Sequence, residues 1–435
     1  MKERKISFSP PDITQAEIDE VVDALKSGWI TTGPKTKRFE TELAAFMGTE
    51  KCAALNSATA AEECGLRLLG IGPGDEVITS AYTYTASASA ICHVGATPVL
   101  CDVAPGSFEM DYERLPELIT SKTKAIVPVD IAGHMADYDT LAAVIDSCKG
   151  KWTPANDTQA AFDRLPILAD GAHSLGAVYK GKPAGSVADL TSFSFHAVKN
   201  FTTAEGGALT WRAGALDSQD AYKQLMLMSL HGQSKDALAK TQVGAWEYDI
   251  VFPGWKCNMT DITAGLGLAQ LTRYPGLLNR RRALVARYEY GLRDMDVALL
   301  RHYSTGPDDD AAPRILTDEE AATQRAAETA APAGFASSGH LMLVRLLGKS
   351  SEFRNQLIIE MAQAGVATNV HYKPLPLLSA YKNLGFDIAN YPNAYAQFEN
   401  EITLPLHTLL TDDDVDYIID VFKESYAKLE SAGVA

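Results

Sequence analysis

A lysine that follows an apolar stretch is the first residue in this sequence that could do chemistry. Lys199 stands five residues after Ser194, at the end of the apolar run 190–195, and the glycine pair Gly206-Gly207 comes after it. Burial disfavours a charged ammonium and lowers the pKa of a lysine, so that its neutral amine becomes a nucleophile toward a carbonyl carbon. Taken alone, Lys199 would more simply be an exposed surface lysine, so other residues have to decide.

An acidic residue follows a second apolar run. Asp170 comes directly after 165–169 and precedes Gly171, Ala172 and His173. A buried carboxylate at the end of a strand is costly unless it meets a cation or hydrogen-bond donors. A protonated pyridine nitrogen would supply that cation, and the carboxylate would keep the ring charged as an electron sink. The simpler alternative for Asp170 is a helix N-cap.

A third candidate is a phosphate-binding turn. The stretch 56–60, Asn-Ser-Ala-Thr-Ala, follows the apolar run 52–55 and would open a helix, where hydroxyls and free N–H groups can hold a phosphate. Ser194 could add a further hydroxyl, and Tyr84 could stack on a flat ring. Ordinary helix caps and a core tyrosine are the alternatives. The ordered set of phosphate turn, aromatic residue, acidic strand end and Ser-x4-Lys is far more specific than any one member.

The elements that must position these residues alternate along the chain. From about residue 36, short apolar runs are separated by helical stretches, mostly about 20 to 45 residues apart before residue 190. This spacing predicts β-α-β units and a mainly parallel sheet with helices on both faces, where ligands bind beyond the carboxyl ends of the strands. The expected strands are 52–55, 76–80, 97–103, 124–129, 165–169, 190–195 and 207–211.

An arm and a helix precede this large unit, and a smaller unit follows it. Thr14 and Glu17 have capping-box spacing, apolar residues between 18 and 25 form one stripe, and Gly28 would end the helix. A basic helix start at 280–282 leads to the second unit, with a strand at 340–346, a helix at 352–365 and a last helix from the acidic residues 412–414. The predicted domains are an N-terminal arm and helix at 1–35, a large domain at 36–275 and a small domain at 276–435.

Two stretches look inserted into this plan. One covers about 149–164, and the other covers about 305–336, which is rich in Ala, Asp, Glu and Thr and poor in large apolar residues. Both are interpreted as solvated surface loops or partly helical excursions.

Composition excludes several classes of protein. The 435 residues are 46% hydrophobic and 22% charged, as in ordinary globular domains, and the net charge of −16 argues against nucleic-acid binding, which needs a basic face. A single phosphorylated ligand stays possible, because backbone N–H groups can hold it. No secretory signal and no membrane span of about 18 apolar residues is found. The six cysteines form no C-x-x-C pair and are interpreted as small buried hydrophobes, so we expect the cytoplasm and no metal.

Together these motifs resemble the sugar aminotransferases of pyridoxal phosphate (PLP) fold type I, often called the DegT-like family. The resemblance covers nearly the whole chain except the two inserts. It implies an α/β fold, with a large PLP-binding domain around a mainly parallel sheet and a smaller C-terminal α+β domain. The matching stretches are 27–34, 56–60, 74–79, 95–98, 170–173, 193–207, 253–261 and 370–376.

The resemblance also implies a role for each matching residue. Lys199 would carry PLP as a Schiff base and move protons, Asp170 would pair with the pyridine nitrogen, and His173 would lie near the phenolic oxygen. Tyr84 would stack on the ring. Asn258 would reach the phosphate from the neighbouring subunit, so that the active site would need a homodimer. The residues that would hold the phosphate within one chain are Ala58, Thr59 and Ser194.

The sugar pocket is implied in the same way. Its lining would be Trp29, Ile30 and Thr32, with His196 and His371 near it. For His196, His371 and Asn258, a hydrogen-bonded core histidine or a turn asparagine stays the alternative.

Two short motifs narrow the implied substrate. Relatives that aminate carbon 4 usually carry Phe-Ser-Phe-His before the lysine and Glu-Gly-Gly after it, whereas relatives that aminate carbon 3 carry Phe-Ser-Phe-Tyr-Pro and Asp-Gly-Gly. This chain has His196 and Glu205 at those positions, so it resembles the carbon-4 group, including enzymes of lipid A and pseudaminic acid type pathways. It departs from many relatives at Ala169, where they have a second acidic residue, and in the lengthened connection into that strand.

The implied reaction moves an amino group from glutamate, which leaves as 2-oxoglutarate, to carbon 4 of a nucleotide-linked 4-keto-6-deoxy sugar for surface polysaccharide or lipopolysaccharide biosynthesis. Three alternatives compete with it. A carbon-3 aminotransferase is disfavoured by the motif around His196. A PLP-binding regulator without turnover would not need both Lys199 and Asp170. A PLP-dependent sugar dehydratase would carry a histidine in place of Lys199.

Overall fold

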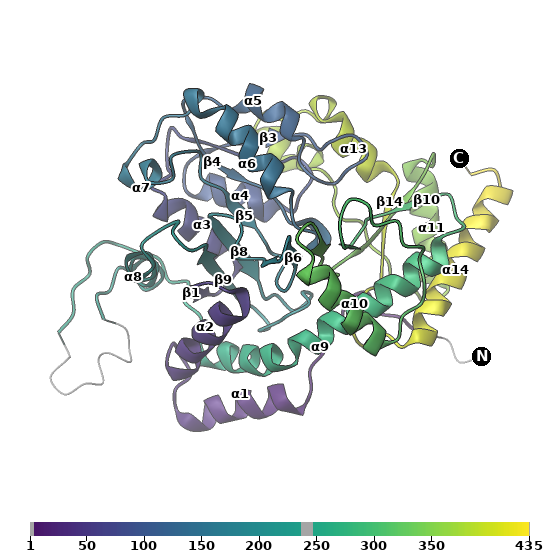
Figure 1. The fold of residues 1–435 in the computed structure, drawn as a ribbon, viewed down its shortest axis with the longest axis horizontal. Coiled ribbons are helices and arrows are strands. Elements are labelled where there is room, and N and C mark those ends of the chain that lie inside the picture. Colours follow the sequence, from purple (N-terminus) through teal and green to yellow (C-terminus); the bar gives the residue numbers. More distant parts are fainter. Residues whose placement is uncertain (1–3, 236–246, 435) are drawn as a thin grey trace.

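The computed structural model describes residues 4–235 and 247–434 (Figure 1). A central β-sheet with helices around it forms one side of the molecule, and a second, smaller sheet with its own helices forms the other. The long helix α9 (Asp261–Leu292) runs from the first part to the second (Figure 1). No helix in the described residues has both the length and the apolar character that crossing a bilayer requires.

The central sheet has the predicted strands. Four of them lie in the order β1-β9-β8-β5 and three in the order β3-β2-β4, and single parallel bridges join the end of β4 to β5. All neighbours run parallel except those of β9, which is antiparallel to β1 and β8. The strands are β1 (Cys52–Leu55), β2 (Glu76–Ser80), β3 (Thr97–Cys101), β4 (Thr123–Val127), β5 (Leu168–Asp170), β8 (Leu190–Ser194) and β9 (Gly207–Trp211). The prediction of a mainly parallel α/β sheet is confirmed.

Both faces of this sheet are buried, which explains the nearly continuous apolar runs. Adjacent residues of one strand belong to different core clusters, because successive side chains point to opposite faces. Val77 and Ile78 in β2 separate in this way. The covering helices are α2 (Pro34–Met47), α3 (Ala58–Leu68), α4 (Thr85–His93), α6 (Tyr138–Ser147), α8 (Ser218–Ser229) and α9.

The first helix has the predicted ends and an unexpected orientation. Helix α1 (Gln15–Ser27) begins at Thr14 in a capping box with Glu17 and ends at Gly28, whose φ of +80° is a left-handed conformation that favours glycine. The predicted apolar stripe, however, points outward: Ile18, Val22 and Leu25 are exposed. The helix is held to α9 instead by a buried carboxylate, since Glu17 pairs with Arg273 at 2.7 Å.

The prediction of a basic helix start at 280–282 is wrong. These arginines lie inside α9, which continues through Pro275. Two of them are buried and bond to neighbouring segments rather than to a helix end: Arg281 donates to the carbonyl oxygens of Gly339 and Leu406, and Arg282 pairs with Glu328 at 2.8 Å. The proposed domain boundary at 275/276 stays a prediction, and it falls within α9.

The second sheet is antiparallel, in the order β10-β13-β14, and is covered by α11 and α14. The predicted strand and the two predicted helices are confirmed, the strand beginning at Met342. Thr411 forms a capping box with Asp414, so the acidic cluster does lie at the start of the last helix. The elements are β10 (Val297–Leu299), β13 (Met342–Leu346), β14 (Glu401–Leu404), α11 (Ser351–Gln363) and α14 (Asp412–Ser431).

The two inserts are partly helical, as predicted. The first holds only short turns of helix. In the second, α10 (Asp318–Ala330) packs on α9 and is not merely solvated, because Ala321 and Glu328 are buried. After α10, β12 (Phe335–Ala336) pairs with β11 (Tyr303–Ser304) on one side and with β6 (Val178–Tyr179) on the other. The remaining short elements are η1 (Tyr112–Arg114), α5 (Leu115–Leu118), η2 (Ile131–Gly133), η3 (Lys149–Lys151), α7 (Asp157–Ala160), β7 (Lys182–Pro183), η5 (Leu375–Leu377), α12 (Ser379–Asn383), η6 (Ile388–Asn390) and α13 (Pro392–Glu399).

Candidate active site

A cavity of about 350 Å³ lies where β5 and β8 end and α3 begins. This is the edge of a parallel sheet at which ligands are expected, because the carboxyl ends of the strands and the amino ends of the following helices meet there. Most of the predicted site residues line it: Ala58, Thr59, Tyr84, Asp170, His173, Ser194, His196, Lys199 and His371.

Lys199 lies in this cavity after the end of β8. Burial lowers the pKa of its ammonium to about 8, and the charge of Asp170 raises that pKa in part. A sizeable fraction of the amine is therefore neutral near physiological pH, which a nucleophile toward an aldehyde requires. Lys199 is thus more than the exposed surface lysine that its type alone would suggest.

Asp170 is the buried carboxylate at the end of β5. Its Oδ2 accepts a hydrogen bond from Ser87 Oγ at 2.6 Å, and its Oδ1 accepts one from the backbone N–H of Ala172 at 3.1 Å. No helix begins directly after it, so the helix N-cap alternative is wrong. Among the ion pairs of residues 4–235 and 247–434, none includes Asp170, so a ligand cation such as a protonated ring nitrogen fits beside it.

His173 is a neutral wall of the cavity. Burial lowers its pKa well below the usual value, and the charges of Lys199 and His371 add to this effect. Its Nδ1 accepts from the backbone N–H of Ala132 at 3.2 Å, which leaves the proton on Nε2, 3.1 Å from the Tyr372 hydroxyl. The ring therefore has a fixed tautomer and can donate from Nε2.

The turn that the sequence predicts to hold a phosphate opens helix α3, as expected. Ser57 caps α3 by accepting from the N–H of Ala60 at 3.1 Å, and the first-turn N–H groups of Ala58 and Thr59 have no partner within a helix. Glycine is required opposite this turn, because a Cβ at Gly207 would lie 2.5 Å from the nitrogen of Ala58. The glycine pair after Lys199 thus keeps the helix start open, and the turn fits a phosphate group.

Tyr84 lies at the mouth of the cavity and not in the core. Its side chain is 59% exposed, so the core alternative is wrong, and its ring lies 6.0 Å from that of Tyr372. A flat aromatic face beside the cavity can stack on a planar ligand.

The two other histidines differ in their surroundings. Burial lowers the pKa of His371 to about 4, and its Nδ1 lies 2.9 Å from Thr403 Oγ1, so it is also a hydrogen-bonded histidine of the interior. His196 is exposed, and its Nε2 lies 3.5 Å from the carboxylate of Glu205. Both histidines line the cavity, and His196 is the exposed one of the two.

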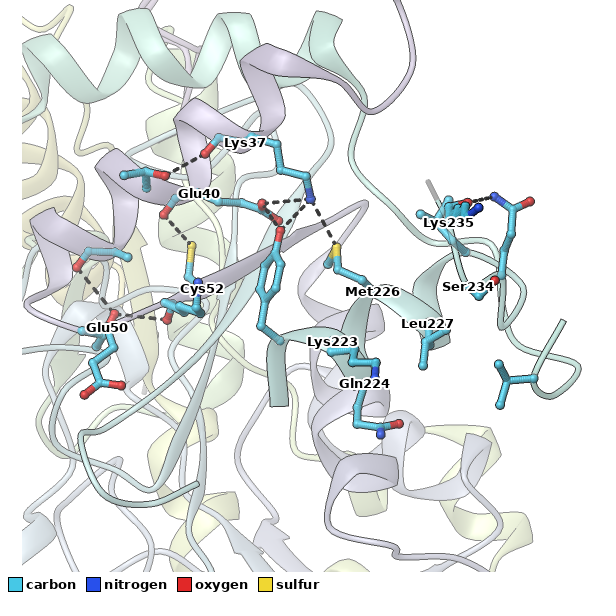
Figure 2. A pocket seen from close by; sticks show the side chains of 18 of the residues that line it. Lys37, Glu40, Glu50, Cys52, Lys223, Gln224, Met226, Leu227, Ser234 and Lys235 are labelled. Carbon is cyan, nitrogen blue, oxygen red and sulfur yellow. Dashed lines mark hydrogen bonds and ion pairs between the residues drawn. The ribbon is translucent and has the colours of Figure 1, made fainter. Parts of the chain in front are cut away.

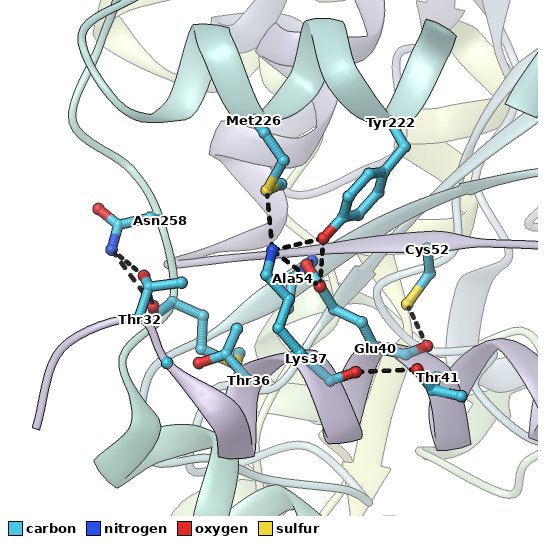
Figure 3. A network of polar contacts seen from close by, with 12 residues as sticks. Thr32, Thr36, Lys37, Glu40, Thr41, Cys52, Ala54, Tyr222, Met226 and Asn258 are labelled. Carbon is cyan, nitrogen blue, oxygen red and sulfur yellow. Dashed lines mark hydrogen bonds and ion pairs between the residues drawn. The ribbon is translucent and has the colours of Figure 1, made fainter. Parts of the chain in front are cut away.

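The remaining predicted residues, Trp29, Ile30, Thr32 and Asn258, do not line this cavity. Asn258 donates from Nδ2 to Thr32 and to the carbonyl of Met259, and Thr32 donates to the same carbonyl at 2.6 Å (Figure 3). We call the segments 28–34 and 256–261 the Thr32–Asn258 edge. Asp261 fastens it, because its carboxylate accepts from the N–H groups of Gly33 and Thr36.

A larger cavity of about 1070 Å³ lies beside this edge, between α2 and α8 (Figure 2). It holds none of the predicted residues. Three of its polar side chains bond to one another: Tyr222 donates to Glu40 at 2.6 Å, and Lys37 donates to Tyr222 and pairs with Glu40 at 3.6 Å (Figure 3). These contacts hold α2 against α8, and we interpret the cavity as structural.

Three residues of the site were missed by sequence reasoning. Ser87 holds Asp170, Tyr372 contacts His173, and Glu62 lines the cavity from α3. Tyr372 follows His371 directly, and Ser87 stands one helical turn after Tyr84, so spacing could have indicated both.

Comparison with known proteins places these features in a family. Residues 11–423 match the profile of the DegT/DnrJ/EryC1/StrS aminotransferase family. The spore coat polysaccharide biosynthesis protein SpsC of Bacillus subtilis is 34% identical over 423 residues, which cover 96% of each chain.

Solved structures agree over nearly the whole chain. The PMP form of Spr1654 from Streptococcus pneumoniae, whose name gives it as a sugar aminotransferase, is 55% identical, with a TM-score of 0.89 over 98% of this chain and 100% of that one. Its PLP form is 53% identical, with a TM-score of 0.88 over the same shares. PseC of Helicobacter pylori, an aminotransferase of pseudoaminic acid biosynthesis, is 26% identical, with a TM-score of 0.78 over 98% and 100%.

Proposed function

Because the chain belongs to the DegT/DnrJ/EryC1/StrS aminotransferase family and is a PLP-dependent aminotransferase of fold type I, we propose that it moves an amino group from glutamate to carbon 4 of a nucleotide-linked 4-keto-6-deoxy sugar. The observation that carries the proposal is one buried cavity that holds Lys199, Asp170 and an open helix start. The names of SpsC and PseC support surface polysaccharide or glycan biosynthesis as the pathway.

The cavity residues fit the cofactor group by group. The N–H groups of Ala58 and Thr59, kept open by Gly207, would hold the phosphate with the Ser194 hydroxyl, and Asp170 would meet the ring nitrogen. Tyr84 would stack on the ring. When bound, PLP supplies an aldehyde that takes up the amino group and a ring that stores the electron pair left on a neighbouring carbon.

Lys199 and His173 would do the chemistry that falls to the protein. The Lys199 amine would first hold the cofactor and then move a proton, taking it from the donor carbon in one half of the cycle and returning one in the other. Its lowered pKa supports this role, because a base is most effective when its pKa lies near the working pH. His173, neutral and fixed, would donate from Nε2 to an oxygen of the cofactor.

Carbon-4 specificity is assigned to His196 and Glu205. They are exposed at the cavity mouth and lie close enough to act as one polar pair. A hydroxyl of the sugar could bond to both, and this would orient carbon 4 rather than carbon 3 toward Lys199.

A homodimer completes the proposal. Exposed apolar side chains gather on α1 and just beyond it, at Ile18, Val22, Leu25 and Ile30, and such a patch usually marks an interface. The Thr32–Asn258 edge lies outside its own chain's cavity, which supports the idea that it serves the cavity of a second subunit. All six cysteines are free thiols, which supports a reducing compartment, the cytoplasm.

The test is an assay of the holoenzyme with glutamate and a panel of UDP-, GDP- and dTDP-linked 4-keto-6-deoxy sugars. We expect 2-oxoglutarate in step with an amino sugar whose nitrogen is placed on carbon 4 by NMR. An amine on carbon 3 would contradict the regiochemistry. Formation of no 2-oxoglutarate, even in a single turnover of glutamate, would favour the regulator over the enzyme.

A further inference from the structure

A second carboxyl group lies in the cavity, on the first turns of α3. Glu62 is 1% exposed, lines the cavity, and stands one helical turn beyond Ala58 and Thr59. Its Oε1 accepts a hydrogen bond from Ser192 Oγ at 3.2 Å, whereas its Oε2 is buried and has no hydrogen-bond partner in the structure. A buried polar atom without a partner is costly, so its presence in the cavity calls for a reason.

The position of Glu62 brings it to Asp170. Ser192, which bonds to Glu62, is the residue that faces Asp170 across the β5–β8 pairing. No ion pair of the described residues includes either carboxyl group, and the cation that faces Asp170 in the cavity is Lys199, whose pKa the charge of Asp170 raises in part. Two negative charges in such a place repel each other strongly, so one of the two groups keeps its proton.

The hydrogen bonds decide which group is neutral. Asp170 accepts from a hydroxyl and from a backbone N–H, which stabilise a negative charge. Glu62 has only the Ser192 hydroxyl. Burial and the charge of Asp170 raise the pKa of Glu62 well above its usual value. Glu62 is therefore the neutral partner, and Oε2, the oxygen without an acceptor role, is the place for its proton.

We propose that the neutral carboxyl of Glu62 donates a hydrogen bond from Oε2 to Asp170 and so keeps Asp170 ionised and aimed at the ring nitrogen of the cofactor. Glu62 is a positioning residue, since it acts through Asp170. This inference rests on the proposed role of Asp170. A donor on Asp170 lowers its basicity, and the proton between it and the ring nitrogen then stays on the ring, where it is needed for the electron sink.

The experiment uses the full-length holoenzyme loaded with PLP that carries nitrogen-15 in the ring. Glu62→Gln keeps a donor on the same side chain, whereas Glu62→Leu removes it without a large change in volume. We expect the nitrogen-15 chemical shift and kcat of the Gln variant to stay near those of the wild type. In the Leu variant the shift should move toward that of a neutral pyridine, and kcat should fall about ten- to hundred-fold at unchanged KM, as for one lost hydrogen bond to a charged group.

Thermal unfolding separates this role from a structural one. Replacing a buried carboxyl by an apolar side chain should leave Tm equal or higher, so a drop in kcat without a drop in Tm supports positioning. Glu62→Met is a second apolar variant in case the Leu variant does not fold. Glu63→Leu is the matched control on the same helix, since Glu63 faces His93 at 2.7 Å outside the cavity. It should leave the chemical shift unchanged.

Two results would overturn the inference: an unchanged chemical shift and kcat in Glu62→Leu, or a Gln variant that behaves like the Leu variant. Failure of the proposed function would look different. If the wild-type enzyme binds PLP but aminates none of the sugars, the nitrogen-15 shifts of the wild type, Glu62→Gln and Glu62→Leu still report on the contact between Glu62 and Asp170.

Discussion

The Lys199 cavity and the Thr32–Asn258 edge were indicated by motifs of the same family, but they differ in how they are completed. In the cavity, side chains from β5, β8, α3 and α4 converge within one chain, and Asp170 and His173 are held by neighbours of that chain. At the edge, Asn258 and Thr32 bond to each other beside the exposed side chain of Ile30. A single chain thus brings Lys199 and Asp170 together, whereas the proposed homodimer would assign the Thr32–Asn258 edge to the cavity of a second subunit.

The largest effect should come from the cavity itself. Changing Lys199 to Ala removes the amine that would hold PLP and move the proton, so we expect kcat to fall by at least about 10²- to 10⁴-fold and the visible absorbance of lysine-bound PLP to disappear. Activity and absorbance spectra measure this. Lys122→Ala, at an exposed lysine, is the control. Near-normal transamination by the Lys199 variant would disprove the assignment.

The next effect should come from the electron sink. Changing Asp170 to Asn removes a preorganised charge, so kcat should fall on the order of 10²- to 10³-fold, with the protein still folded. Asp130→Asn is a matched control. Asp130 is also a buried carboxylate, three residues after the end of β4 and bonded to Ser174 at 2.6 Å, but it does not line the cavity. The Asp130→Asn variant should have a lower Tm and a nearly unchanged kcat. A lower kcat in Asp130→Asn together with an unchanged kcat in Asp170→Asn would contradict the catalytic role of Asp170 and the structural role of Asp130.

Mixed dimers test the edge directly. Asn258→Ala should weaken PLP binding about ten- to hundred-fold, as expected for a lost hydrogen bond to a phosphate. Co-expressed with the Lys199→Ala chain, it should regain activity at limiting PLP, because one site of each mixed dimer combines an intact Lys199 with the partner's intact Asn258. About a quarter of all sites would be complete after random pairing. If Asn258 served its own chain, the mixture would stay as weak as its parts.

The smallest effect is a pH dependence of cofactor loading. Because burial lowers the pKa of Lys199 to about 8, the rate at which the apoprotein captures PLP should rise about tenfold per pH unit below that value and level off above it. Stopped-flow absorbance measures the rate. Asp170→Asn should move the curve to lower pH, because Asp170 raises this pKa. A rate that is flat from about pH 6 to 9 would contradict a buried amine.

The lowered pKa of Lys199 also predicts how the stability of the apoprotein changes with pH. The pKa of Lys199 is lower in the folded protein than the ordinary 10.5, so between about pH 8 and 10.5 the unfolded chain binds more protons than the folded one. Lys199 therefore makes the apoprotein more stable as the pH rises through this window. Lys199→Met should remove that contribution.

Local patterns predicted most of the sheet and the cavity, because both follow from strand ends. The carboxyl group of Asp170 and the helix start at Ala58 follow β5 and β1, which run in the same direction, so both lie at the same edge of the sheet. Contacts between distant segments were not predictable in this way. The composition of the basic run at 280–282 suggested a helix start. Its real role depends on a contact between distant segments, the pairing of Arg282 with Glu328, which the sequence does not show.

Helix α1 and Glu62 are two further cases in which contacts between distant segments could not be predicted. The apolar stripe of α1 indicated that one face of the helix packs against something, but the sequence did not show which segment or subunit that is. The helix turns Glu17 toward α9 and leaves Ile18 and Leu25 outside. Glu62 in turn resembles any other helix residue until Ser192 and Asp170 are placed beside it.

The second insert has a mechanical consequence for how substrate enters. Its strand β12 pairs with β6, and the N–H of Lys180 donates to the carbonyl of Gly334 at 2.8 Å, while α10 is tied to α9 through Arg282 and Glu328. A displacement of the second insert away from β6 would break the β6–β12 pairing and the hydrogen bond between Lys180 and Gly334. We therefore expect the molecule to open by local displacement of the exposed segment around His196 and Glu205, and the body behind it to stay rigid during turnover.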